Sequence, residues 1–320
     1  MAVPLPAGTM ARLRRLQAEH GVSWFMAAAT ALAALLHSWT GRPDITFGVP
    51  VSTRDRGRFA ELLGPCLDLT VLRSRPAEHG TVRDLLQAMR SEVLDVFEHP
   101  DAPFDELVEH LRPERLPGRT PYADVALNMN LLSGRRTVLG TSELIPLFFD
   151  SFWEKETKFA LTVTLSEQDG VLSGAFSYRG HRFAAEDVRA LAGAFGALLS
   201  ELPELLDLQL DELGLPAPGA GAPSRPAPVH GTRPEEPAAI TPGGRIQYRD
   251  YVAAQEARRD SAGRAADLAY WAEHLAGAPP YLDFPAPASP GPTAPCRSRW
   301  PRVCWTAGAP CNRSTASPRT

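Results

Sequence analysis

Lysine is almost absent from this chain. Of its 33 basic residues only Lys155 and Lys158 are lysines, and the rest are arginines. A phosphate-binding loop that ends in lysine is therefore excluded from nearly the whole sequence. The 320 residues carry a net charge of −4. Because nucleic-acid-binding proteins usually carry a net basic charge, we expect no nucleic acid among the partners.

Cysteines and long apolar runs are also scarce. Cys66 stands alone, and Cys296, Cys304 and Cys311 are spaced unlike the paired Cys-x-x-Cys of zinc sites, so we expect neither a disulfide framework nor a metal site. The longest apolar run, residues 24–36, is shorter than the ~18–20 residues that span a bilayer. It also begins too late for a charged leader peptide. We therefore expect a buried helix in a cytoplasmic protein with no membrane partner.

Residues 1–215 mix helical and strand patterns, which predicts an α/β fold with a mixed sheet and flanking helices. With their cap residues included, the predicted helices lie at residues 6–21, 23–41, 81–97 and 184–199. The predicted strands lie at residues 45–51, 67–72 and 122–132, followed by a hairpin of 159–165 with 171–178.

Two helix starts carry capping signals. Thr81 and Asp84 have the spacing of a capping box, and the helix they begin has an apolar face of Leu85, Leu86, Met89, Val93 and Phe97. After His99, Asp101 can cap a further helix and Pro103 suits its first turn. His99 is the best placed of the eight histidines, but a lone histidine rarely marks a site, so a structural role is favoured.

The rest of the chain divides by composition. Residues 216–244 hold eight prolines and five glycines with little apolar material, which is typical of a linker. Residues 245–287 recover a helical signal around Tyr251 and Trp271. Within the predicted tail, 288–320, residues 291–320 contain no Asp, Glu, Lys, Leu or Ile but three of the four cysteines. This composition favours a shifted reading frame, and a disordered extension is the alternative.

Five short motifs in the first part of the chain occur in a fixed order. They are residues 48–54 (GVPVSTR), 64–73 (GPCLDLTVLR), 99–105 (HPDAPFD), 115–122 (RLPGRTPY) and 158–161 (KFAL). Together they resemble the C-terminal half of the condensation domain of non-ribosomal peptide synthetases. The motif positions that this resemblance marks are Gly64, Asp68, Arg73, His99, Asp101, Pro103, Phe104, Arg119 and Pro121.

A further motif lies out of order. Residues 246–255 (IQYRDYVAAQ) resemble the Tyr-x-Asp-Tyr-Ala-Val-Trp motif of the same family, with Tyr248 and Asp250 at motif positions and Ala254 in place of Trp. In the family this stretch precedes the part that matches residue 1. The resemblance therefore implies the end of one condensation domain joined to a displaced middle fragment of a second.

The resemblance implies a fold like one half of chloramphenicol acetyltransferase. In the family, two such halves form a V around a tunnel, where substrates tethered to the phosphopantetheine of carrier domains are joined by an amide bond. No cofactor is expected to bind directly, and the implied partners are carrier proteins and other synthetase modules. A half of this kind would expose the face that meets its partner half, so we expect self-association.

The family's His-His-x-x-x-Asp-Gly motif is absent, and no other His–acid pair is evident to replace it. We therefore assign no catalytic residue, and expect the motif positions to shape the tunnel wall or the contact between halves. Three functions stay open. The chain can be a fragment that is inactive alone, a transferase completed in trans by a partner with the His-His motif, or a non-catalytic module that docks carrier proteins.

Overall fold

The computed structural model describes residues 1–54, 59, 62, 64–130, 137–139, 142–144, 157–168, 170–216, 248–259 and 261–284. The predicted linker 216–244, apart from residue 216, and the predicted tail 288–320 lie outside these residues. The same holds for both ends of the predicted 245–287 piece. Below, the core means the described residues of 1–216, and the 248–284 segment means those between 248 and 284.

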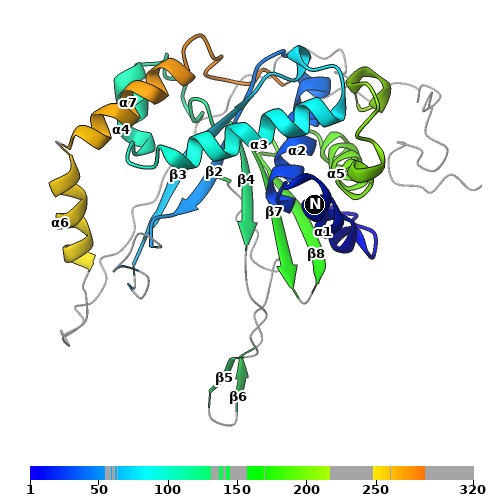
Figure 1. The fold of residues 1–320 in the computed structure, drawn as a ribbon, viewed down its shortest axis with the longest axis horizontal. Helices are drawn as coiled ribbons and strands as arrows, with labels where there is room; N and C mark the ends of the chain where they lie inside the picture. Colours follow the sequence, from blue (N-terminus) through cyan, green and yellow to red (C-terminus); the bar gives the residue numbers. More distant parts are fainter. Residues whose placement is uncertain are drawn as a thin grey trace, which may run out of the picture.

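A six-stranded mixed sheet organises the core (Figure 1). Its strand order is β1-β8-β7-β4-β2-β3. The contacts of β4 with β2 and β7 are parallel, and the others are antiparallel. The strands are β1 (Ala2–Val3), β2 (Ile45–Ser52), β3 (Leu67–Ser74), β4 (Val125–Asn130), β7 (Leu161–Gln168) and β8 (Val171–Tyr178). Two short strands, β5 (Thr137–Leu139) and β6 (Ser142–Leu144), form a separate antiparallel pair.

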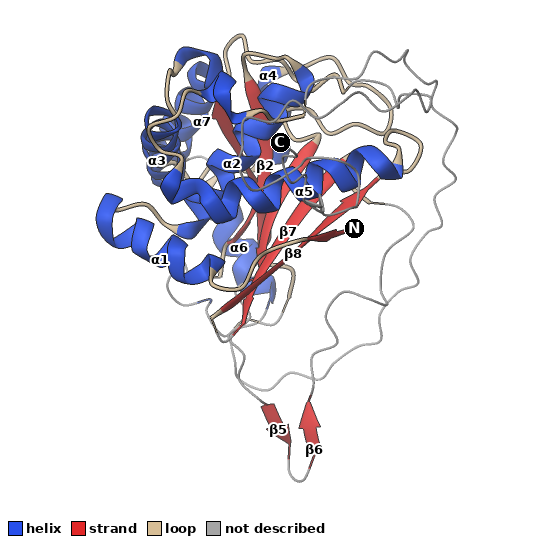
Figure 2. Ribbon diagram, turned by 90° about the vertical axis from the view of Figure 1, so that its right-hand side faces the viewer, coloured by secondary structure: helices blue, strands red, loops and turns tan. Residues whose placement is uncertain are grey.

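Four helices pack on one face of this sheet (Figure 2). They are α1 (Thr9–His20), α2 (Trp24–Thr40), α3 (Val82–Glu98) and α5 (Ala185–Glu201). The shorter α4 (Phe104–Leu111) contacts β3, and α7 (Ala262–His274) packs on α4, with α6 (Tyr248–Arg258) preceding it. Short 3-10 helices lie at Pro76–Glu78, Leu202–Glu204 and Leu210–Leu213. The predicted α/β class with a mixed sheet and flanking helices is confirmed.

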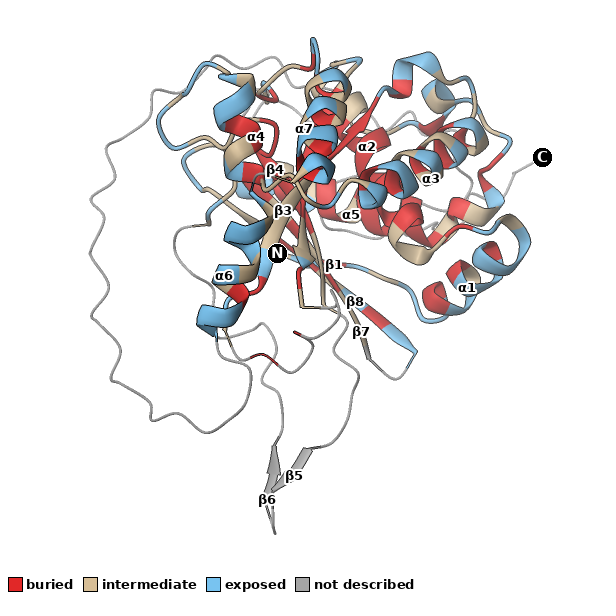
Figure 3. Cartoon of the chain, turned by 60° about the vertical axis from the view of Figure 1, so that its left-hand side comes forward, coloured by how far each residue is buried: buried red, intermediate tan, exposed pale blue. Residues whose placement is uncertain are grey.

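Helix α2 is the central helix of the core. Its alanines are buried almost completely, and their small side chains leave room for α1, α3 and α5 to pack around it. The Ser23 hydroxyl accepts a hydrogen bond from the Met26 N–H at 3.2 Å, and Gly41 ends the helix in the left-handed conformation. Figure 3 shows α2 buried along most of its length, whereas α6 is mostly exposed. The expected buried helix over the longest apolar run is thus confirmed.

No single helix among the described residues is long and apolar enough to cross a membrane. Helices α1 and α2 meet that test only when taken together, and the chain bends by 102° between them.

The two faces of the sheet differ in chemistry. On β7, Leu161, Val163 and Leu165 are buried under the helices, while the alternating Thr162, Thr164 and Ser166 are half-buried on the opposite face. The strand register extends this polar row to β4 and β8, through Asn128, Asn130, Ser173 and Ser177. We call the surface that carries this row the polar face. The register also places the exposed Val171 of β8 and Leu67 of β3 on this side of the sheet.

Some local predictions are wrong. Helix α4 begins at Phe104 with Pro103 at its N-cap position, so Asp101 does not cap it. The Asp68 carboxylate, distant in sequence, instead lies 3.5 Å from the Phe104 N–H. Phe97 ends the predicted apolar face of α3 but is 49% exposed, whereas the preceding Val96 is buried.

Candidate functional site at the contact of the core with the 248–284 segment

Most of the sequence-predicted site residues lie along the contact between the core and the 248–284 segment, which packs on α3, α4 and β3. In Figure 1 α7 lies beside α4 at the β3 side of the sheet. Three groups of polar contacts hold this junction, centred on His99, Arg73 and Arg119.

The first group joins the end of α3 to α7. The Nδ1 of His99 lies 3.0 Å from Oδ1 of Asp267, and the backbone N–H of Asp101 donates to the other oxygen of that carboxylate at 2.7 Å. The indole N–H of Trp271 donates to the His99 carbonyl at 3.1 Å. The ring of Tyr270 stacks on the imidazole with centroids 3.8 Å apart. His99 therefore joins the end of α3 to α7 through its side chain and its carbonyl.

The second group is built on Arg73 of β3, which is only 8% exposed. Its Nε and Nη2 donate to the Asp44 carboxylate, with the shortest distance 2.6 Å. Its Nη1 donates to the carbonyls of His274 at 2.5 Å and Ala276 at 3.0 Å. The buried charge is thus neutralised by one carboxylate, and the guanidinium binds the end of α7 through its backbone.

The third group surrounds Asp124, which is 2% exposed. The Nε of Arg119 donates to Oδ2 of Asp124 at 2.9 Å, and its Nη2 donates to that same oxygen and to the Leu282 carbonyl. The guanidinium also lies over the Tyr281 ring, 4.3 Å from its centroid. Pro121 follows in the turn, and the next residue, Tyr122, donates its N–H to the Pro280 carbonyl at 2.6 Å.

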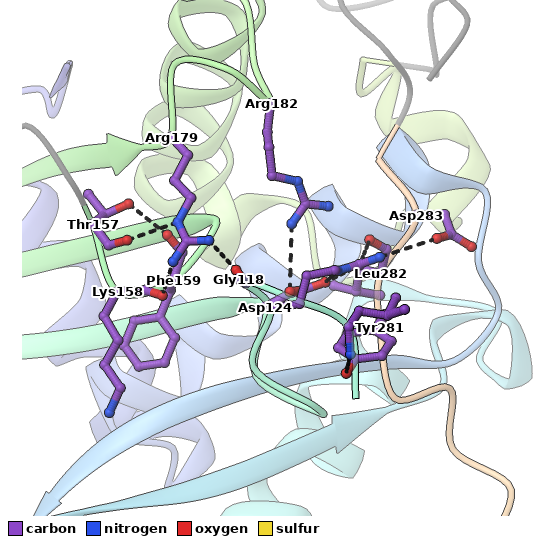
Figure 4. Close-up of polar contacts among 12 residues, drawn as sticks. Gly118, Asp124, Thr157, Lys158, Phe159, Arg179, Arg182, Tyr281, Leu282 and Asp283 are labelled. Atoms are coloured by element: carbon purple, nitrogen blue, oxygen red, sulfur yellow. Dashed lines mark hydrogen bonds and ion pairs between the residues drawn. The ribbon is translucent and has the colours of Figure 1, made fainter. Parts of the chain in front are cut away.

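Two further arginines approach the same region (Figure 4). Arg182 points at Asp124, with its Nη1 3.7 Å from Oδ1, and burial lowers the pKa of this guanidinium although the carboxylate opposes that effect. Arg179 donates to the carbonyls of Thr157 at 2.9 Å and Lys158 at 2.7 Å, and also to that of Gly118. These contacts tie the loops that precede β4 and β7 to the end of β8.

Gly64 and Tyr248 meet directly. The φ of Gly64 is +156°, and a Cβ at this position would lie 2.6 Å from Cδ2 of the Tyr248 ring. The Tyr248 hydroxyl donates to the Pro65 carbonyl at 3.2 Å. Asp250, the other motif position of α6, is exposed. The glycine is therefore required by the close approach of the tyrosine.

A cavity of about 460 Å³ lies between α4 and α6. One wall carries the carboxylates of Asp68, Asp101, Asp105, Glu106 and Glu109, and the other carries Arg258, Arg259 and Arg264. Arg264 pairs with Glu106, and Arg258 lies 3.8 Å from Asp101. This pattern is a seam of ion pairs between the core and the 248–284 segment.

The structure brings two histidines against carboxylates that the sequence spacing did not indicate. Besides His99 with Asp267, the Nε2 of His274 lies 2.9 Å from Oε1 of Glu92, so two His–acid pairs exist. Neither histidine lines the described cavity, and both lie at the junction of α3 with α7. Among the described residues no group of three or more His, Cys, Asp or Glu side chains is placed to hold a metal ion.

Sequence reasoning missed the partners of the motif residues. Asp44, Asp124 and Asp267 supply the carboxylates, and Tyr281 supplies the ring under Arg119. Asp124 follows Arg119 by five residues, which is a weak local signal. Asp44 and Asp267 lie 29 and 168 residues from the side chains they bind, so no spacing could indicate them.

Comparison with protein families assigns residues 1–220 to the condensation domain. Phosphinothricin tripeptide synthetase PhsC of Streptomyces viridochromogenes is 30% identical over 269 residues, which cover 77% of this chain and 24% of that protein. Tyrocidine synthase 3 of Brevibacillus parabrevis is 28% identical over 193 residues, which cover 60% of this chain and 3% of that protein. The chain thus spans less than a quarter of the length of these relatives.

Solved structures give the same fold. The X-domain from teicoplanin biosynthesis superposes with a TM-score of 0.56 at 20% identity, covering 66% of this chain and 48% of that one. The condensation domain from the monacolin K polyketide synthase MokA gives a TM-score of 0.55 at 19% identity, with the same two coverages. The likeness therefore covers two thirds of this chain and about half of each of the others.

Proposed function

The chain belongs to the condensation-domain family of nonribosomal peptide synthetases, and we propose that it acts in peptide biosynthesis as the C-terminal half of such a domain. In this proposal the 320 residues bind carrier-tethered substrates and form no amide bond alone. The observation that carries this proposal is that the motif arginines form their hydrogen bonds within the protein. The guanidinium groups of Arg73 and Arg119 bind carboxylates and carbonyls of the protein itself.

The lack of the family's catalytic histidine motif supports the same proposal. Amide formation between tethered substrates needs an amine that is neutral and held in reach of the thioester, and a positioned base contributes about 10²–10⁴-fold. The His-His-x-x-x-Asp-Gly motif does not occur in the sequence. His99 and His274 pair with carboxylates at the α7 junction, away from the polar face of the sheet.

The partners in this proposal are peptidyl and aminoacyl carrier domains with other synthetase modules. Substrates would arrive on the phosphopantetheine arms of those carriers, so that no cofactor needs to bind this chain directly. The relatives are large synthetases of which this chain matches only a part, which favours action beside other modules.

A second candidate is a transferase completed in trans. The polar face favours it, because Thr162, Thr164 and Ser166 are half-buried and lie on the side of the sheet opposite α1, α2, α3 and α5. A second polypeptide carrying the His-His motif could pack there and supply the base. Hydroxyl and amide groups suit a wet contact of this kind.

Mass spectrometry of the amide product tests both. The purified chain is incubated with one carrier bearing a peptidyl thioester and one bearing an aminoacyl thioester, and an intact condensation domain serves as the positive control. We expect no product above the rate without protein. Product at the rate of the positive control would overturn the proposal. Product that appears only when a separate polypeptide with the His-His motif is added would establish completion in trans.

Carrier binding is measured separately by calorimetry with the same loaded carriers. Binding without turnover, in the presence or absence of the second polypeptide, would identify a docking module. Absence of any binding would contradict the role in peptide biosynthesis.

A further inference from the structure

The 248–284 segment is built into the folded core. Trp271, Leu275, Ala278 and Leu282 are 1–7% exposed and belong to the main hydrophobic cluster of the core. Tyr251 closes a second cluster with Phe59, Leu62 and Cys66. The segment thus contributes apolar side chains to both clusters.

The polar contacts are directional. Residues 274, 276, 280 and 282 each offer a backbone carbonyl to a donor of the core. The donors are the guanidinium groups of Arg73 and Arg119 and the N–H of Tyr122. The Asp267 carboxylate likewise accepts from the Asp101 N–H of the core and pairs with His99. In the other direction, the Trp271 indole N–H donates to the His99 carbonyl. Without the segment, buried donors on the core would lose their acceptors.

The covalent connection is too long to position the segment. Residues 217–247 separate the described end of the core from Tyr248, and a chain of this length can extend to roughly 100 Å. The length of the link alone therefore does not fix where the segment lies. The structure places the segment through the contacts described above.

We propose that the core carries a specific binding surface for residues 248–284, and that the segment occupies it as a non-covalently held piece. The surface is made by His99, Arg73 and Arg119 with the apolar residues around them. The matching ligand is a helix with Asp267 and Trp271 on one face, followed by a turn and an irregular tail through Leu282. The fold then does not need residues 217–247, and a second polypeptide with the 248–284 sequence can fill the site.

Cleavage of the full chain tests this proposal. A recognition sequence for a site-specific protease is inserted after residue 230, and the circular dichroism spectrum is recorded before and after the cut. We expect the two pieces to co-elute in native size-exclusion chromatography at about 1 µM of protein, because the dissociation constant of a specific interface should be no higher than this concentration. Separation of the pieces, or loss of the folded spectrum on cutting, would overturn the proposal.

Specificity is tested with matched charge reversals. A synthetic, fluorescent peptide of residues 248–284 competes with the bound piece of the cut protein, and the peptide carries either Asp267→Lys or Glu273→Lys. Glu273 lies on the same helix but is exposed and provides the control. We expect Asp267→Lys to weaken binding at least about tenfold and Glu273→Lys to leave it within about twofold. Equal effects of the two changes would contradict a specific surface.

Discussion

Arg73 shows at the residue scale how motif positions are used in this chain. Its Nε, Nη1 and Nη2 all donate to Asp44 or to carbonyls of α7 and the residues just after it. A buried guanidinium is costly unless its donors are paired. The same requirement explains the pairing of Arg119 with Asp124 and Leu282. These positions therefore have a physical reason that does not depend on a substrate.

Gly64 gives a prediction that separates packing from backbone strain. A Cβ here would lie 2.6 Å from the Tyr248 ring, and the φ of +156° disfavours other residues. We expect Gly64→Ala to lower the free energy of unfolding by about 1–3 kcal/mol, and by less when Tyr248→Ala is present. Urea denaturation measures both.

Gly263→Ala is the control for this change, because no heavy atom lies within 4 Å of the Cβ it would add on α7. It should be neutral or slightly stabilising, since alanine favours a helix more than glycine does. If Gly64→Ala were equally harmless, the contact with Tyr248 would not be present in solution.

Tyr270 gives a prediction about pH. Burial, followed by repulsion from Glu92, Asp95 and Glu98, raises the pKa of its phenol above the ordinary value of 10.0. Its hydroxyl is buried without a hydrogen-bond partner among the described residues. Between pH 10 and the raised pKa the unfolded chain ionises while the folded one does not, so folding loses stability as pH rises.

The measurement compares wild type with Tyr270→Phe in urea at pH 8, 9, 10 and 11. At pH 8 we expect the variant to be equal or more stable, because the unpaired hydroxyl is removed. Above pH 10 the wild type should lose up to about 1.4 kcal/mol per pH unit relative to the variant. If the free energies of unfolding of the two proteins differed by the same amount at all four pH values, the buried position of this hydroxyl would be contradicted.

At the scale of elements, sequence patterns predicted the structure correctly where the interacting residues are close in sequence. Thr81 caps α3, and its hydroxyl accepts from the Asp84 N–H at 3.1 Å, as the capping box predicted. The hairpin predicted at 159–178 is present as β7 and β8. Both depend on contacts between residues near in sequence, and the sequence pattern contains them directly.

The start of α4 could not be predicted in the same way. The N–H of its first residue, Phe104, lies 3.5 Å from the carboxylate of Asp68, 36 residues earlier, while the local candidate Asp101 contacts α7 and α6. The pairing of the Asp44 and Asp267 carboxylates with distant side chains was not predicted for the same reason. A side chain that pairs across the fold leaves no periodic signal in its own segment.

For the whole molecule, the order of motifs predicted the fold of the core, but only the structure gives the place of the 248–284 segment. The sequence indicated a helical piece beyond a linker, and Trp271 was among its signals. The contacts of Trp271 with the His99 carbonyl and of Leu282 with Arg119 join residues 172 and 163 positions apart in sequence. Residue spacing and hydrophobic periodicity cannot predict contacts between residues so far apart in sequence.

The polar face leads to a prediction about association. Self-association was expected from the sequence because a half-domain should expose an apolar face, but association of that kind needs a large contiguous apolar patch. Asn128, Thr164 and Ser166 instead place amide and hydroxyl groups in the middle of this face, between the exposed Val171 of β8 and Leu67 of β3 at its two sides. We therefore expect the chain to sediment as a monomer at about 10 µM, a concentration at which a contact of about −7 kcal/mol would be half-formed.

A triple variant tests whether this polarity keeps the chain monomeric. Thr162→Leu, Thr164→Leu and Ser166→Leu together place an apolar row along β7, on the face opposite the buried Val163. Burying three leucine side chains between two copies contributes roughly 1.5–3 kcal/mol each, so this variant should show a sedimentation coefficient that rises with concentration. The control replaces the same residues by Ser, Ser and Thr, which keeps the hydroxyls, and should remain monomeric. Concentration-dependent sedimentation of the wild type would show that another surface drives association, and a monomeric leucine variant would show that the polar face is not accessible to a second copy.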